Sequence, residues 1–123
     1  MSETTLQETC VAEAIQTALT PLFPGAVFPH RYKGPLTEYI VWNYNVAGEV
    51  WADDVPQAAR YLVQVHLYYP HGKDPRKAIL AIERALFDQD FTWPIPTDAT
   101  DADGQHWVLE CEYTDGGGYY GFA

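Results

Sequence analysis

The sequence has few cations and no long apolar run. Its 123 residues include seven Lys and Arg against 17 Asp and Glu, a formal net charge of −10. Affinity for DNA or RNA depends on cations that neutralise phosphates, so this balance argues against tight nucleic-acid binding. No apolar stretch approaches the roughly 20 residues of a transmembrane helix, and the N-terminus lacks the basic start and apolar core of a signal peptide. We therefore expect a cytoplasmic protein that does not enter a membrane.

Cysteine is scarce as well. Cys10 and Cys111 are the two cysteines, one early and one late in the chain. Without an export signal, such a pair is better interpreted as reduced core thiols than as a disulfide. Cys10 falls on the apolar stripe of an expected helix, where a thiol is buried and inert.

The motifs of common catalytic and metal sites are missing. The sequence has no Gly-rich phosphate loop, no G-x-S-x-G elbow and no Cys/His pair at a known motif spacing. Residues 99–104, followed by Glu110, partly match an EF-hand calcium loop, but Ala99 would stand at the first ligand position. An Asp/Gly hairpin turn explains this segment better. We therefore predict no catalytic residue, no cofactor and no metal, and a protein that is not an enzyme.

The histidines leave one alternative open. His66 and His106 both lie on polar faces of expected strands. If those strands pair, Glu110 or Glu112 would stand near His66 in an acid–base or metal cluster, but the sequence does not fix that register. Solvated histidines on a sheet face are the default interpretation.

Apolar and aromatic residues are plentiful and regularly spaced. The hydrophobic fraction is 47% and the aromatic fraction 15%, which indicates a folded domain. Helical spacing of apolar residues predicts helices over about 5–22 and from Asp74-Pro75 to about 88–90. The first helix has a capping-box spacing at Thr5 and Glu8.

Two-residue alternation and β-branched or aromatic residues predict the strands. Asn45 and Gly48 are expected to turn the chain after the second strand. The third strand is long and is expected to stand out past the core as an edge or arm. The expected strands span 26–28, 38–44, 59–69, 91–95 and 105–113.

The element order is therefore α-β-β-β-α-β-β. This order predicts an α+β fold with two helices packed on a mainly antiparallel sheet of four to five strands. We expect one domain over residues 1–115 and a flexible Gly/aromatic tail over residues 116–123.

The chain has more aromatic residues than one small core holds easily. Tyr and Trp are enriched where interfaces bury their anchors, so we expect an interface between subunits or with partners. The long third strand and the connector at residues 46–56 are candidates for one contact patch. The candidate interface residues are Trp42, Trp51, Asp53, Asp54, Tyr68, Tyr69, Tyr119 and Tyr120.

Several segments together resemble the small tail-completion and tail-terminator proteins of long-tailed bacteriophages and prophages. The resemblance is carried, from residue 6 to 113, by these elements: the helix ending in Leu22-Phe23-Pro24-Gly25, the strand Tyr39-Ile40-Val41-Trp42, the connector Asp53-Asp54, the strand from Tyr61 to Tyr68, the helix from Ile79 to Leu86 and the strand from His106 to Tyr113. It implies self-assembly into a ring, typically a hexamer, which caps the tail tube and contacts the head connector. Assembly would take place in the bacterial host cytoplasm, and the protein would end in the neck of the virion.

Two alternatives remain. One is a small-molecule-binding module or enzyme with a pocket on the aromatic sheet face, with His66 and Glu110 as candidate polar groups. The other is an acidic inhibitor domain that binds a basic partner, which rests on charge alone. A ring protein forms oligomers, whereas a pocket protein can be a monomer that a ligand stabilises.

Overall fold

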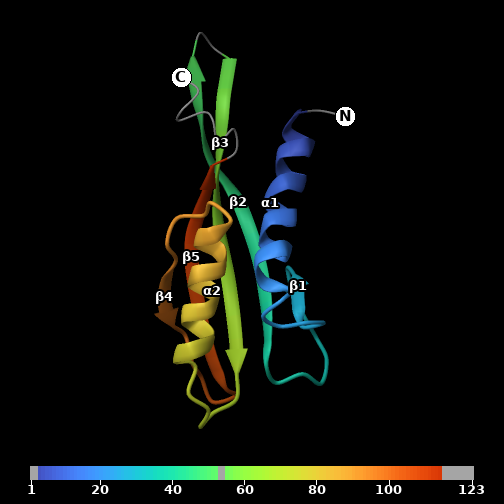
Figure 1. Ribbon diagram of the computed structural model, residues 1–123, viewed down its shortest axis with the longest axis vertical. Coiled ribbons are helices and arrows are strands. Elements are labelled where there is room, and N and C mark those ends of the chain that lie inside the picture. Colours follow the sequence, from blue (N-terminus) through green and yellow to red (C-terminus); the bar gives the residue numbers. More distant parts are fainter. Residues whose placement is uncertain (1–2, 53–54, 115–123) are drawn as a thin grey trace.

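A computed structural model describes the backbone of residues 3–52 and 55–114 and the side chains of residues 10–46 and 60–113. Within these ranges the chain forms two helices and five strands in the predicted order (Figure 1). The elements are α1 (Glu3–Leu19), β1 (Val27–Pro29), β2 (Tyr39–Ala52), β3 (Val55–Tyr69), α2 (Arg76–Asp88), β4 (Ile95–Asp98) and β5 (Gln105–Thr114). The expected tail at residues 116–123 lies outside the described residues.

The strands form one sheet in the order β1-β2-β3-β5-β4. β1 runs parallel to β2, and the other three pairs are antiparallel. Both helices lie on the same side of this sheet (Figure 1). The predicted α+β architecture with a mainly antiparallel sheet is therefore confirmed.

Alternation in β3 separates the two faces of the sheet. Tyr61, Val63, Val65 and Leu67 are at most 1% exposed and face the helices. The residues between them are half-buried or exposed, and Leu62 is 45% exposed. Because one face of a two-residue repeat is buried, the repeat also fixes the register of the strand. We call the side away from the helices the open face.

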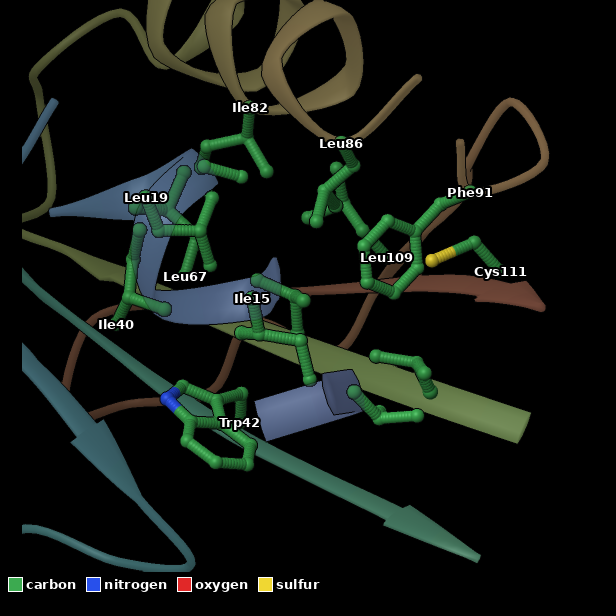
Figure 2. Close-up of a cluster of buried hydrophobic side chains, with 14 of the residues drawn as sticks. Ile15, Leu19, Ile40, Trp42, Leu67, Ile82, Leu86, Phe91, Leu109 and Cys111 are labelled. Carbon is green, nitrogen blue, oxygen red and sulfur yellow. The ribbon is translucent and has the colours of Figure 1, made fainter. Parts of the chain in front are cut away.

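The buried core lies between the helices and the sheet (Figure 2). Ile15 and Leu19 of α1 and Ile82 and Leu86 of α2 are fully buried against the strands. Trp42 of β2 belongs to this core, and its indole Nε1 has no hydrogen-bond partner among the described residues. The other buried members of the cluster are Val11, Ala18, Ile40, Tyr61, Val63, Val65, Leu67, Phe91, Leu109 and Cys111.

Helix α1 corrects two expectations. It begins at Glu3 and ends at Leu19, and a turn in which the N–H groups of Leu22 and Phe23 both donate to the Leu19 carbonyl replaces the expected last helical turn. Cys10 is exposed, so it does not belong to the core as its position on the apolar stripe suggested. Cys111 is buried as predicted, and both thiols are free.

The expected turn at Asn45 and Gly48 does not occur. β2 continues through both residues to Ala52, and its pairing with β3 shifts by one residue between Val46 and Gly48. A second shift, between Val50 and Trp51, lies further along the same hairpin. Such shifts are β-bulges, which bend and twist a ladder without ending it, so Ala47 is an extra residue in the ladder and the hairpin becomes longer than predicted.

The segment before β4 also differs from expectation. Residues 91–94 are not strand. Phe91 is 2% exposed, and its side chain fills the end of the core. β4 starts later, at Ile95, and pairs only with β5 among the described strands. It is an edge strand, as the prolines around it predicted.

Candidate functional site

A row of stacked rings crosses the open face of the sheet, and we call it the ring row. It begins on β1 and in the loop after it, where the rings of Phe28 and Tyr32 stack with centroids 4.3 Å apart. Tyr32 meets Tyr39 of β2 at 4.7 Å, and Tyr39 stacks on Tyr68 of β3 at 4.7 Å with 14° between the ring planes. Tyr68 in turn stacks on His106 of β5 at 4.4 Å and 13°.

Strand register places these rings side by side. Tyr39 is the direct partner of Tyr68 in the β2–β3 pairing, and Tyr68 is the direct partner of His106 in the β3–β5 pairing. Rings at directly opposed positions lie close enough to stack, and such aromatic pairs stabilise a sheet by roughly 0.2–1 kcal/mol each. The centre of the ring row is therefore held by the sheet backbone and not by loops.

The ring row ends in a pair of histidines. His66 Nδ1 and His106 Nε2 are 2.8 Å apart, a hydrogen bond between two imidazoles. One ring nitrogen donates and the other accepts, so at most one of the two imidazoles carries a positive charge while this bond is present. On the other side of His66, the Asn43 Nδ2 lies 3.5 Å from His66 Nε2.

The surroundings keep both histidines uncharged. Burial lowers the pKa of His66, and the nearby His106 lowers it further, while Glu110 acts in the opposite direction. Burial also lowers the pKa of His106, against the attraction of Asp101. Loss of solvent disfavours the charged imidazolium in each case, so the pair is neutral at physiological pH.

The structure settles the open question of the glutamates. Glu110 is the register partner of Gln64, which donates a 3.4 Å hydrogen bond to it, and it lies near enough to His66 to affect that pKa. Glu112 does not join the pair, because Arg60 Nη2 binds its carboxylate at 2.6 Å. Nowhere in the described part of the chain do three His, Cys, Asp or Glu side chains come together as metal ligands.

A hollow of about 400 Å³ adjoins the ring row at the end of the sheet where Tyr39 lies. Its volume falls within the range of small-ligand sites. Three rings of the row and two carboxylates contribute to its lining. The lining residues are Leu36, Thr37, Tyr39, Tyr68, Tyr69, Pro70, His71, Asp101, Asp103, Gly104, Gln105 and His106.

The acidic side of the hollow is a tight turn between β4 and β5. Asp101 and Gly104 form an isolated bridge, and the Asp101 Oδ1 accepts the backbone N–H of Asp103 at 2.9 Å. Asp98 Oδ1 accepts the N–H of Thr100 in the same way. These are Asx turns within a hairpin connection, which confirms the hairpin interpretation over the EF-hand match.

The candidate interface residues are found in different places. Tyr68 lies in the ring row and lines the hollow. Tyr69 packs against the core, with the Lys73 ammonium 5.0 Å from its ring centroid. Trp42 is 4% exposed, so this fold leaves it no surface for a partner, which corrects its assignment as an interface anchor.

The remaining candidates cannot be placed. Trp51 is in β2, but its side chain lies outside the described residues. Asp53, Asp54, Tyr119 and Tyr120 lie outside them entirely.

Sequence reasoning did not bring Tyr32, Tyr39, Asp101 and Asp103 together in one site: it counted Tyr39 only among the surplus aromatics and considered Asp101 and Asp103 only as part of the EF-hand match. For Tyr39 a signal was present: the two-residue period that buries Ile40 places its neighbour on the opposite face. The contact of Tyr39 with Tyr68, in contrast, depends on register, which the period alone does not give.

Two further findings bear on function. In the described part of the chain, no helix has the length and apolar character needed to cross a membrane. Compared with protein-family models and with curated proteins, the sequence matches none.

Proposed function

We propose that the chain is a structural protein of long-tailed bacteriophages or prophages, a tail terminator or tail-completion protein. In this proposal it assembles into a homo-oligomeric ring, six subunits in the typical case, at the head–tail junction. The ring binds tail-tube and head-connector proteins, does not hold DNA tightly and catalyses no reaction. It forms in the host cytoplasm and remains in the neck of the virion.

The observation that carries the proposal is the β2–β3 hairpin, which extends beyond both helices at one end of the molecule (Figure 1). Within the described residues, β5 pairs with β3 only as far as Arg60, and β1 pairs with β2 only at residues 40–42. The β2–β3 pairing continues past this region to Ala52 and Val55. We call residues 47–52 and 55–59 the arm.

An arm of this kind favours assembly for a physical reason. A two-stranded hairpin is marginally stable in water, because it lacks a third strand or a packed layer that would support it. Its outer edges also present backbone N–H and C=O groups that a neighbouring chain can pair with. At about 3.3 Å per residue, the arm reaches roughly 20 Å, far enough to lie on the next subunit. Contact between an arm and a different patch of its neighbour is heterologous, the type that closes rings.

The experiment is to shorten the arm. Val46 and Tyr61 are direct partners in the register, so replacing residues 47–60 by Asn-Gly joins them through a two-residue turn of the type that hairpins prefer. We expect the full-length chain to approach the mass of six subunits with rising concentration in light scattering coupled to size exclusion. The shortened chain should remain a monomer whose circular dichroism keeps the helical signal and loses only the strand contribution of the arm.

Arg60→Gln in the full-length chain is the matched control. Shortening also removes the ion pair between Arg60 and Glu112, and an exposed pair of this kind contributes at most about 1 kcal/mol. This control should assemble like the parent. A full-length chain that stays monomeric at every concentration, or a shortened chain that still forms the ring, overturns the proposal.

A further inference from the structure

The hollow beside the ring row is lined by acidic side chains. Asp101 and Asp103 line it, and none of its twelve lining residues is Lys or Arg. These two carboxylates make the hollow an anionic recess.

The aromatic part of the lining adds a second kind of recognition. Tyr39, Tyr68 and His106 line the hollow with ring edges and polar ring atoms, because Tyr68 is stacked on Tyr39 at one face and on His106 at the other. A phenol oxygen accepts hydrogen bonds, and a guanidinium has five N–H donors.

We infer that the hollow binds the side chain of an arginine from a basic partner protein. The carboxylates of Asp101 and Asp103 would pair with the guanidinium, and the phenol oxygens of Tyr39 and Tyr68 would accept hydrogen bonds from it. Arginine is favoured over lysine because its planar fork has five N–H donors, enough to bind a carboxylate at two points and a further acceptor beside it. The inference rests on the proposed function in one respect, since it gives an assembly protein a second contact surface apart from the arm.

Charge identifies the partner as a different protein and not a second copy. The chain has only seven Lys and Arg. Three of them are already in ion pairs, Arg60 with Glu112, Lys73 with Glu38 and Arg76 with Asp74. A basic segment of another protein, in contrast, is attracted to an acidic surface of a chain with a net charge of −10.

The test uses a minimal probe, the capped tripeptide acetyl-Gly-Arg-Gly-amide, titrated into the ¹⁵N-labelled full-length chain. The matched probe carries citrulline in place of arginine, which keeps the shape and removes the charge. We expect saturable amide shifts near Tyr68, Asp101 and His106 with the arginine peptide. The citrulline peptide should leave these amides in place.

Asp101→Asn is the informative variant. Asparagine keeps the Oδ1 acceptor for the Asp103 N–H, so the turn should persist while the charge is lost. Binding should weaken about fivefold, the size expected for one exposed charge contact. Asp88→Asn, an exposed residue of α2 on the opposite side of the sheet, removes the same charge and should bind like the parent.

Three results would overturn the inference: shifts spread over the acidic surface without favouring the hollow, equal binding of the citrulline peptide, or equal affinities of Asp101→Asn and Asp88→Asn. The mass of the Asp101→Asn oligomer separates this inference from the proposed function. If the ring forms but the peptide does not bind, only the arginine site is refuted. If the peptide binds but the chain stays monomeric, only the ring is refuted.

Discussion

Phe91 offers the sharpest test of the core, because Phe87, an exposed residue near the end of α2, supplies a matched control. Phe91 is 2% exposed, and its ring lies 4.8 Å from that of Tyr113 at the end of β5. Its backbone N–H donates to the Leu86 carbonyl, so the residue is fixed where the chain leaves α2. Phe87, four positions earlier, is 52% exposed, and the centroid of its ring lies 5.5 Å from that of Trp93.

The magnitude follows from this difference in burial. Phe91→Ala removes a buried ring and leaves a cavity, which lowers the free energy of unfolding by about 3–5 kcal/mol. In a domain of this size 1 kcal/mol shifts Tm by about 4 °C, so Tm should fall by roughly 12–20 °C. Phe87→Ala removes surface that water already reaches and should lower the unfolding free energy by no more than about 1 kcal/mol.

The assay is urea unfolding followed by tryptophan fluorescence, at a concentration low enough to keep the chain monomeric. The slope of unfolding free energy against urea should be the same in both variants, since their folded states expose similar areas. If Phe91→Ala destabilised the protein no more than Phe87→Ala, the segment after α2 would not close the core as described.

Two further predictions concern titration and thiol reactivity. Because the pKa values of His66 and His106 lie below their ordinary value of about 6.5, the unfolded chain binds protons first, so the free energy of unfolding should fall as pH drops below about 6.5. Urea unfolding at several pH values should show a flatter profile in a double variant with His66→Gln and His106→Gln, and an unchanged profile would contradict the buried pair. Burial, and to a lesser extent the charge of Glu112, raises the pKa of Cys111 to about 12. A thiol reagent should therefore modify only Cys10 in the folded chain and both cysteines in denaturant. Two fast-reacting thiols in the folded chain would refute that assignment.

Sequence pattern predicts those elements whose two faces differ clearly. The alternation in residues 61–69 and 105–113 indicated which side chains are buried, and both strands have that orientation in the structure. The second helix begins one residue after Pro75, and the Asp74 carboxylate accepts the N–H of Arg76. In these segments local preference and tertiary burial agree.

The errors occur where pairing overrides local preference. Asn45 and Gly48 have turn chemistry, yet β3 extends far enough to pair with both of them, and the bulge leaves only Ala47 without a partner in the register. Phe91 has β propensity, but its side chain packs in the core before the chain enters β4. Cys10 fits the helical period, but α1 contacts the sheet over only part of its circumference.

The candidate site was predictable in composition but not in arrangement. The sequence indicated surplus aromatics and two histidines on polar faces. The ring row, however, depends on which residue of each strand lies opposite which residue of the next, as with Tyr39, Tyr68 and His106. Register is a property of the assembled sheet, and so the hydrogen bond between the two imidazoles could not be read from spacing.

The two bulges in the β2–β3 hairpin have a consequence for symmetry. Each bulge bends the ladder and increases its right-handed twist, and both lie at or beyond Val46, where the arm begins. The first bulge therefore sets the direction in which the arm leaves the sheet, and the second bends the arm itself. In a closed ring of six, each subunit turns from the next by about 60°, and an arm that bridges two subunits must match that angle. The number of subunits would then be encoded in backbone geometry: deleting Ala47, the extra residue of the first bulge, would alter the angle and with it the diameter of the ring.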